Sequence, residues 1–84
     1  MAKLRHRFVD LPEVLNAATI SRSTLFREIK CGAFPTPIAV ALRRKAWLEN
    51  EVETVNAARA AGKPRSEILI IVQTLLSART KEAA

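Results

Sequence analysis

The sequence predicts a mainly α-helical domain of the winged helix-turn-helix class, with a small β-hairpin wing and an extra C-terminal helix. Three observations support this prediction. Two short amphipathic segments follow one another across a tight turn, a proline-containing stretch leads into an alternating pair of strands, and the whole net charge of +6 lies in the first half of the chain. A chain of 84 residues forms one small core and leaves little room for a large catalytic cleft.

The charge of the chain is unevenly distributed. Residues 1–45 hold nine Lys or Arg and three acidic residues, whereas residues 46–84 hold five of each. Such a basic half attracts a polyanion such as nucleic acid, through phosphate contacts and the release of counterions. The single cysteine, Cys31, excludes an internal disulfide and fits a reducing cytoplasm. The longest apolar run, residues 68–72, is far shorter than the ~20 residues of a membrane span. We therefore expect a cytoplasmic protein without a membrane partner.

The N-terminal part predicts a short basic element followed by a first helix. Residues 1–9 alternate basic and apolar side chains, which suits either a short strand or a basic arm whose Arg5 and Arg7 contact the DNA backbone. The helix is expected to begin at Asp10, because Asp10 and Glu13 have the spacing of a capping box. It should end near residue 17 or 18.

The second helix is the centre of the functional hypothesis. Ser21 is a suitable N-cap and Gly32 a suitable left-handed C-terminal residue. The residues between them form a polar stripe of Arg, Lys and small hydroxyls that suits the DNA major groove, where such groups donate to base edges and phosphates. The stripe and its flanks consist of Arg22, Ser23, Thr24, Arg27 and Lys30.

The opposite side of this helix is apolar and is expected to face the core. Leu25, Phe26 and Ile29 fall together at helical spacing, so changing any of them should unfold the protein. Residues 19–20 form the turn between the two helices, and Ile20 should fill the angle between them.

A β-hairpin is expected after the prolines at positions 35 and 37. Residues 38–40 and 45–47 would be its strands, and residues 41–44 its turn. Three consecutive basic residues at the tip and on the return strand would form the wing, because such tips lie against phosphates or in a minor groove. These residues are Arg43, Arg44 and Lys45. Trp47 is expected to anchor the hairpin in the core.

Two further helices complete the prediction. The first should run from about residue 51 to 61, with Glu49 or Asn50 as its cap and Glu51 as an ordinary acid of the first turn. Ser66 is expected to cap the second, for which helix is favoured over strand because apolar residues recur in steps of three and four as far as Leu76. This segment either covers the core or presents its stripe to a second copy. The predicted division is therefore residues 1–61 and 62–84.

These motifs, in this order and spacing, resemble the AlpA-like regulators of phages and prophages. That family has a winged-helix-type fold related to MerR-type DNA-binding domains and to phage excisionases. The resemblance covers about residues 8–58. It rests on Leu11–Val14, Ile20–Phe26, Gly32–Pro35 with Pro37, Arg43-Arg44 ahead of Ala46-Trp47, and Glu51–Glu53. It implies that Arg22, Ser23, Thr24 and Arg27 enter the major groove and that Arg43 and Arg44 form the wing. The family's wing turn is usually rich in glycine, whereas this one reads Ala41-Leu42.

The main hypothesis is a sequence-specific DNA-binding transcriptional regulator that needs no cofactor or metal and has no catalytic activity. The resemblance leaves an excisionase as the alternative, which would bend attachment-site DNA and contact an integrase. A different class is an interaction module, in which the apolar C-terminal segment binds a protein and the basic face is incidental. Self-association through residues 66–79 is the alternative to packing of this segment on its own core, which is slightly favoured.

Overall fold

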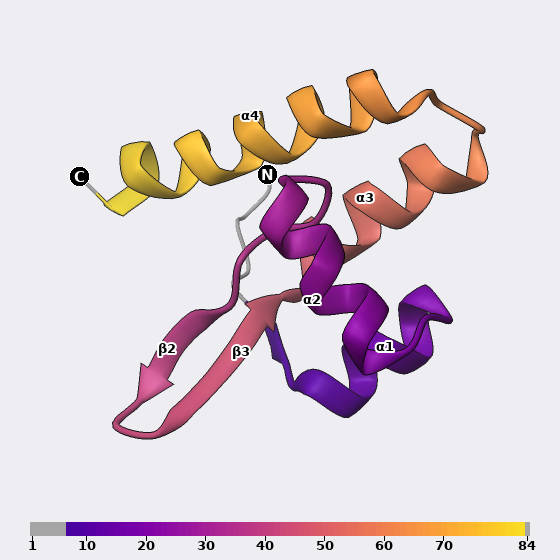
Figure 1. Cartoon of the computed structure of the whole chain (residues 1–84). Coiled ribbons are helices and arrows are strands. Elements are labelled where there is room, and N and C mark those ends of the chain that lie inside the picture. The colour runs from indigo at the N-terminus through magenta and orange to yellow at the C-terminus, as the bar shows by residue number, and fades with distance from the viewer. Residues whose placement is uncertain (1–6, 84) are drawn as a thin grey trace.

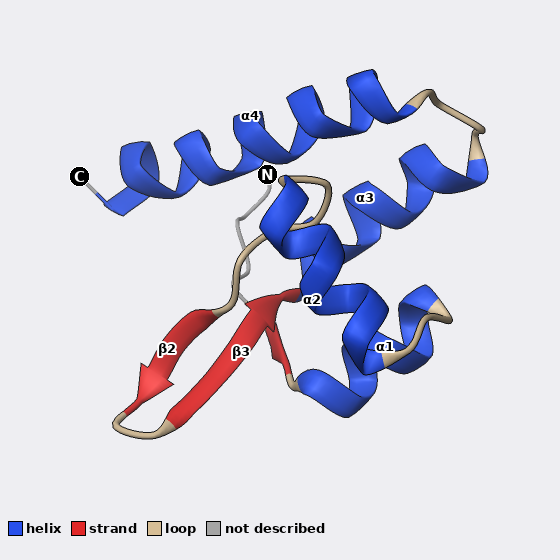
Figure 2. Ribbon diagram, viewed as in Figure 1, coloured by secondary structure: helices blue, strands red, loops and turns tan. Residues whose placement is uncertain are grey.

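The computed structural model describes residues 7–83, and side chains within them as far as Arg79. Four helices pack together, and a small antiparallel sheet extends from one side of them as a hairpin (Figures 1 and 2), so the predicted winged helix-turn-helix fold is confirmed for this part of the chain. The elements are β1 (Phe8–Val9), α1 (Leu11–Ala18), α2 (Arg22–Cys31), β2 (Ile38–Ala41), β3 (Arg44–Leu48), α3 (Glu49–Ala60) and α4 (Arg65–Ala83). Of the alternatives for the N-terminal segment, a strand is confirmed at its end, while Arg5 lies outside the described residues.

Helix α1 begins with the expected capping box. The Asp10 carboxylate accepts from the amide of Glu13 at 3.2 Å, and the Glu13 carboxylate accepts from the amide of Asp10 at 3.3 Å. At the other end, Thr19 adopts a left-handed conformation with φ of 57°, which turns the chain sharply toward α2. Ile20 then packs against the core, as expected for the angle between the two helices.

Side chains of α3 hold the C-terminus of α1 in place. The Asn56 amide donates to the carbonyl oxygen of Ala17, and the Arg59 guanidinium donates to that of Ala18, each at 3.1 Å. The last carbonyls of a helix have no partner within the helix, so these two bonds satisfy groups that would otherwise need water. They also tie the helix-turn-helix pair to α3.

Helix α2 has the predicted caps at both ends. The Ser21 hydroxyl oxygen accepts from the amide of Thr24 at 3.2 Å, and Ser21 donates in turn to the Thr24 hydroxyl at 2.9 Å. Gly32 closes the helix with φ of 85°, a conformation that a residue with a Cβ adopts only with strain.

The sheet has the strand order β1-β3-β2, so β3 lies at its centre. The hairpin turn is shorter than expected, because Ala41 already pairs with Arg44 and only Leu42 and Arg43 lie between them. Neither turn residue has the positive φ that two-residue hairpin turns favour, since Thr19 alone has one among the described non-glycine residues. The strand register shifts at Val40, which indicates a β-bulge. A bulge increases the local twist of the strands, and here it supplies twist that the turn itself does not provide.

Helix α3 begins two residues earlier than predicted, and neither Glu49 nor Asn50 is its cap. The N-cap is Leu48, whose side chain makes no capping bond, because β3 runs directly into the helix. The free amide of Glu49 instead donates to the carbonyl oxygen of Arg7 at 2.8 Å. A backbone partner in the neighbouring chain segment thus replaces the side-chain cap that the sequence suggested.

Helix α4 begins at Arg65, so the prediction of Ser66 as its cap is wrong. The Pro64 carbonyl accepts from the amide of Ile68 at 3.1 Å, which places Ser66 inside the first turn. Val72 is buried in the same cluster as residues of α1, α2 and α3, and Leu75 and Leu76 pack against that cluster. The division of the chain at residues 61 and 62 and self-association through α4 stay predictions. No helix in the described part of the chain is long and apolar enough to cross a membrane.

The core lies between the helices and the inner part of β3, and Trp47 is its aromatic anchor, as expected. The Trp47 indole N–H donates to the carbonyl oxygen of Pro35 at 3.0 Å, in a buried bond. This bond joins β3 to the segment that follows α2. It therefore fixes the base of the hairpin relative to that helix.

A buried ion pair that the sequence prediction missed links α3 to α4. The Glu51 side chain, 3% exposed, accepts from the Arg79 guanidinium at 2.9 Å and 2.5 Å. The same guanidinium donates to the carbonyl oxygen of Thr36 at 2.8 Å. Glu51 had been expected to be an ordinary acid of the first helical turn, but the packing of α4 encloses it. Arg79 keeps the helical spacing of the apolar residues of α4, and this spacing could have indicated from the sequence that its side chain faces the core.

Replacing Arg79 with methionine is expected to lower the free energy of unfolding by about 3 kcal/mol, because it leaves a buried carboxylate without its cation. Adding Glu51→Met should recover part of this loss, since two apolar side chains then replace the pair. Urea unfolding followed by the fluorescence of Trp47, the single tryptophan, measures both effects.

Lys63→Met is the matched control. It breaks the exposed pair with Glu67, whose atoms lie 3.3 Å apart, and should change the unfolding free energy by no more than about 0.5 kcal/mol. If Arg79→Met and Lys63→Met lowered the free energy of unfolding equally, the buried pair with Glu51 would contribute no more to stability than the exposed pair does.

Candidate nucleic-acid interface

The polar stripe of α2 faces solvent. Ser23, Arg27 and Lys30 are all exposed, on the side of the helix that lies away from the buried Leu25. Because these residues recur in steps of three and four, they form one row along the helix. The structure thus brings three of the predicted site residues together on one accessible face.

Phe26 corrects the sequence prediction. It was expected to pack in the core beside Leu25, but its side chain is 41% exposed, whereas that of Leu25 is 0% exposed. One residue of helix advances the direction by about 100°, so Phe26 lies at the border between the core side and the polar stripe. The Arg22 guanidinium carbon lies 5.9 Å from the centre of its ring, within the range of a cation–π contact. The ring therefore supports Arg22 at the surface.

The wing residues project from the hairpin into solvent. Arg43, Arg44 and Lys45 are all exposed, as the sequence predicted for the tip and return strand. The turn also carries Leu42, which is 96% exposed. Figure 1 shows the β2–β3 hairpin extending away from the helices, so its turn projects from this side of the molecule.

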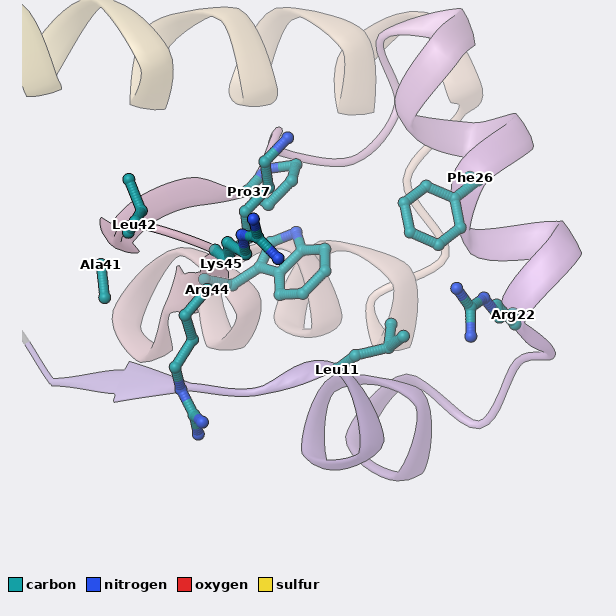
Figure 3. A pocket seen from close by; sticks show the side chains of 10 residues that line it. Leu11, Arg22, Phe26, Pro37, Ala41, Leu42, Arg44 and Lys45 are labelled. Carbon is teal, nitrogen blue, oxygen red and sulfur yellow. The ribbon is translucent and has the colours of Figure 1, made fainter.

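A groove of about 550 Å³ lies between α2 and the hairpin. Figure 3 shows Arg22 and Phe26 of α2 on one side of it and Pro37 and Lys45 on the other. Apolar side chains make much of its lining and four basic side chains lie along it. The lining residues are Leu11, Arg22, Phe26, Pro37, Ala41, Leu42, Arg43, Arg44, Lys45 and Trp47. Residues of α2 and of the hairpin therefore border the same groove and form one continuous surface.

Two predicted site residues have other contacts. Thr24 is half-buried and its hydroxyl accepts from Ser21, so it serves the helix cap. Arg7 lies 3.5 Å from the Glu49 carboxylate and does not line the groove. Its place beside β1, on the edge of β3 that β2 does not occupy, explains this separation.

The single acid of α2 is turned away from the basic face. The Glu28 carboxylate pairs with Arg65 at 3.1 Å, and this hydrogen bond and charge raise the pKa of Arg65 above its ordinary value. The charge of Glu28 is therefore balanced by a residue of α4. The field along the exposed row of α2 stays positive, which favours a negatively charged ligand there.

The site offers binding chemistry. Its side chains are guanidinium, ammonium and hydroxyl donors around an apolar groove, which suits phosphates and base edges. Within residues 7–83 the structure shows no group of three His, Cys, Asp or Glu arranged to hold a metal ion. The sequence did not lead us to predict that Phe26 and Leu42 line the groove. For Phe26, the position four residues after Arg22 could have indicated that the two side chains lie on the same side of the helix.

Comparison with known proteins gives two matches. The family model described as "Prophage CP4-57 regulatory protein (AlpA)" matches residues 7–57. The uncharacterized protein ORF88 of Enterobacteria phage P4 is 38% identical over 61 residues, which cover 73% of this chain and 69% of that protein. No solved structure matches the chain. The family match includes α1, α2 and the hairpin and ends before α4.

Phe26→Ala is expected to lower the free energy of unfolding by less than about 1.5 kcal/mol, because the ring is partly in water already. Leu25→Ala, at the neighbouring buried position, should cost about 3 kcal/mol. Urea unfolding of the two variants measures the difference. A loss at Phe26 as large as that at Leu25 would contradict the placement of this ring at the surface.

Proposed function

Because this chain belongs to the AlpA family of prophage regulatory proteins, whose members are DNA-binding regulators, we propose that it regulates transcription by binding specific DNA sites. Helix α2 enters the major groove, and the hairpin lies along the backbone or in the adjoining minor groove. The main support for this proposal is the groove between α2 and the basic hairpin, because residues of both elements line it and form one surface.

The base contacts are assigned to the start of α2. Arg22 and Ser23 are exposed at its N-terminal end, which is the end that recognition helices present to bases, and Arg27 is exposed just over one turn further along. Arginine donates two hydrogen bonds to guanine, and serine bonds to several bases. Thr24 contributes chiefly by fixing the helix cap. Lys30, near the C-terminal end, contacts phosphate.

The hairpin supplies affinity that does not depend on sequence. Arg43, Arg44 and Lys45 bind backbone phosphates, and each such contact releases counterions. The N-terminal Arg5 and Arg7 are assigned to the backbone as well, with Arg7 exchanging its contact with Glu49 for a phosphate. Phosphate contacts of this kind set the position of the protein on the duplex, while the α2 contacts select the sequence.

Arg27→Ala is expected to weaken binding to the preferred site by about 1–3 kcal/mol, with a much smaller effect on random duplex, because it removes a contact to a base. Arg44→Ala should weaken both duplexes alike and lower the salt slope by about one unit. Titrations at several salt concentrations, on a site selected from a random library with the intact chain, measure both.

Lys63→Ala provides the control, because it removes the same charge from an ammonium group that pairs with Glu67 and lies outside the groove and outside α2. It should leave both affinities nearly unchanged. If Arg27→Ala and Arg44→Ala have the same effect on the selected and random duplexes, the assignment of α2 as the recognition helix is wrong.

An excisionase is the alternative outcome. It would bind adjacent repeats cooperatively and make a complex with an integrase on DNA. Titration of a duplex that holds tandem sites, with and without the integrase, separates the two functions. Independent binding to each repeat and no effect of integrase would favour the transcriptional regulator.

A further inference from the structure

The tip of the hairpin carries an apolar side chain that the fold does not use. Leu42 is 96% exposed, although a large apolar side chain gains free energy by leaving water. It is the first residue of the two-residue turn, and the three residues that follow it are basic. Because Leu42 is exposed and its neighbours are basic, this tip suits a partner that is anionic and can also bury an apolar side chain.

The hairpin holds Leu42 in a defined position. Ala41 pairs with Arg44 immediately before and after the turn, so the turn contains no residues beyond Leu42 and Arg43. At its base, β3 pairs with β1, and Trp47 donates a buried hydrogen bond to Pro35. The position of Leu42 relative to α2 is therefore set by the sheet and the core.

We propose that Leu42 is an apolar wedge that inserts between two base pairs from the minor groove and kinks the DNA. This inference rests on the proposed function, in which α2 occupies the adjacent major groove. Apolar side chains inserted at a base step unstack it partly, and the bend brings more of the duplex into contact with the protein. Here the residues brought to the flanking phosphates are Arg43 and Arg44.

The dimensions of the hairpin fit this arrangement. The minor and major grooves are separated along the duplex by half a helical turn, which is about 17 Å. Strand β3 has five residues and spans about 17 Å from its end beside the core to the turn. The length of β3 is therefore comparable to the spacing between neighbouring grooves, and the hairpin tip and α2 both border one groove of the protein. The minor groove of the duplex is about 6 Å wide and admits a two-residue turn but no helix.

The charges around Leu42 favour DNA over a second copy of the chain. A contact between two copies through Leu42 would bring two sets of Arg43, Arg44 and Lys45 together, which like charges oppose. Phosphates instead attract all three. The narrow minor groove has an enhanced negative potential that draws arginine into it.

The test compares Leu42→Ser with Val40→Ser, a control that removes an exposed apolar side chain from the bulge of the same hairpin. The probe is the duplex selected from a random library with the intact chain. Circularly permuted fragments of it report the bend by gel mobility. 2-Aminopurine at each adenine in the flanking minor groove reports unstacking by its fluorescence.

The unchanged protein and Val40→Ser are expected to bend the duplex and raise the fluorescence at one step. Leu42→Ser should lose both effects while its affinity falls by about ten- to a hundredfold, the value of burying one leucine, and its salt slope stays the same. Leu42→Met should restore the bend, because it returns an apolar side chain of similar size.

Two results would overturn the proposal, and they are distinguishable. If the intact chain selects no duplex, the proposed function fails and the wedge fails with it. If the chain binds its selected site but Leu42→Ser bends the duplex as the unchanged protein does, the wedge alone is wrong. A change in sedimentation of Leu42→Ser without a change in bend would identify the tip as a contact between protein chains.

Discussion

The arrangement of the interface depends on a buried hydrogen bond from the indole of Trp47 to the carbonyl oxygen of Pro35, at 3.0 Å. Leaving either group unpaired in the core would cost more than the bond itself contributes, so the two segments are held in one relative position. Trp47 belongs to β3, which pairs with both other strands and runs directly into α3. Pro35 lies between α2 and β2. The hairpin and α2 are thus positioned relative to each other by the same buried contact.

Among the basic residues whose side chains the structure describes, two groups can be distinguished. Arg7, Arg65 and Arg79 make ion pairs with Glu49, Glu28 and Glu51, and these pairs connect elements of the fold. A second group lies along the exposed face of α2 and the hairpin, and its members are Arg22, Arg27, Lys30, Arg43, Arg44 and Lys45. These six basic residues of the first half of the chain are therefore exposed on α2 and the neighbouring hairpin, where a polyanion gains most from their charge.

Helix α4 lies outside the part of the chain that the family model matches, yet it contacts the residues that support the interface. Arg79 bonds to Glu51 at the start of α3 and to the carbonyl of Thr36, next to Pro35. Val72 enters the common core. These contacts hold the segment from which the hairpin begins in place.

The sequence by itself determined the local features, because caps, turns and periodicity depend on near neighbours. The capping box at Asp10, the caps at Ser21 and Gly32, the exposed row on α2 and the basic hairpin all agree with its prediction. Tertiary structure decided the rest. The start of α3 depends on a hydrogen bond from the amide of Glu49 to the carbonyl of Arg7. The burial of Glu51 depends on Arg79, which lies 28 positions away in the sequence. The exposure of Phe26 depends on the groove that lies beside the hairpin. Such contacts join residues far apart in the chain, so no local pattern encodes them.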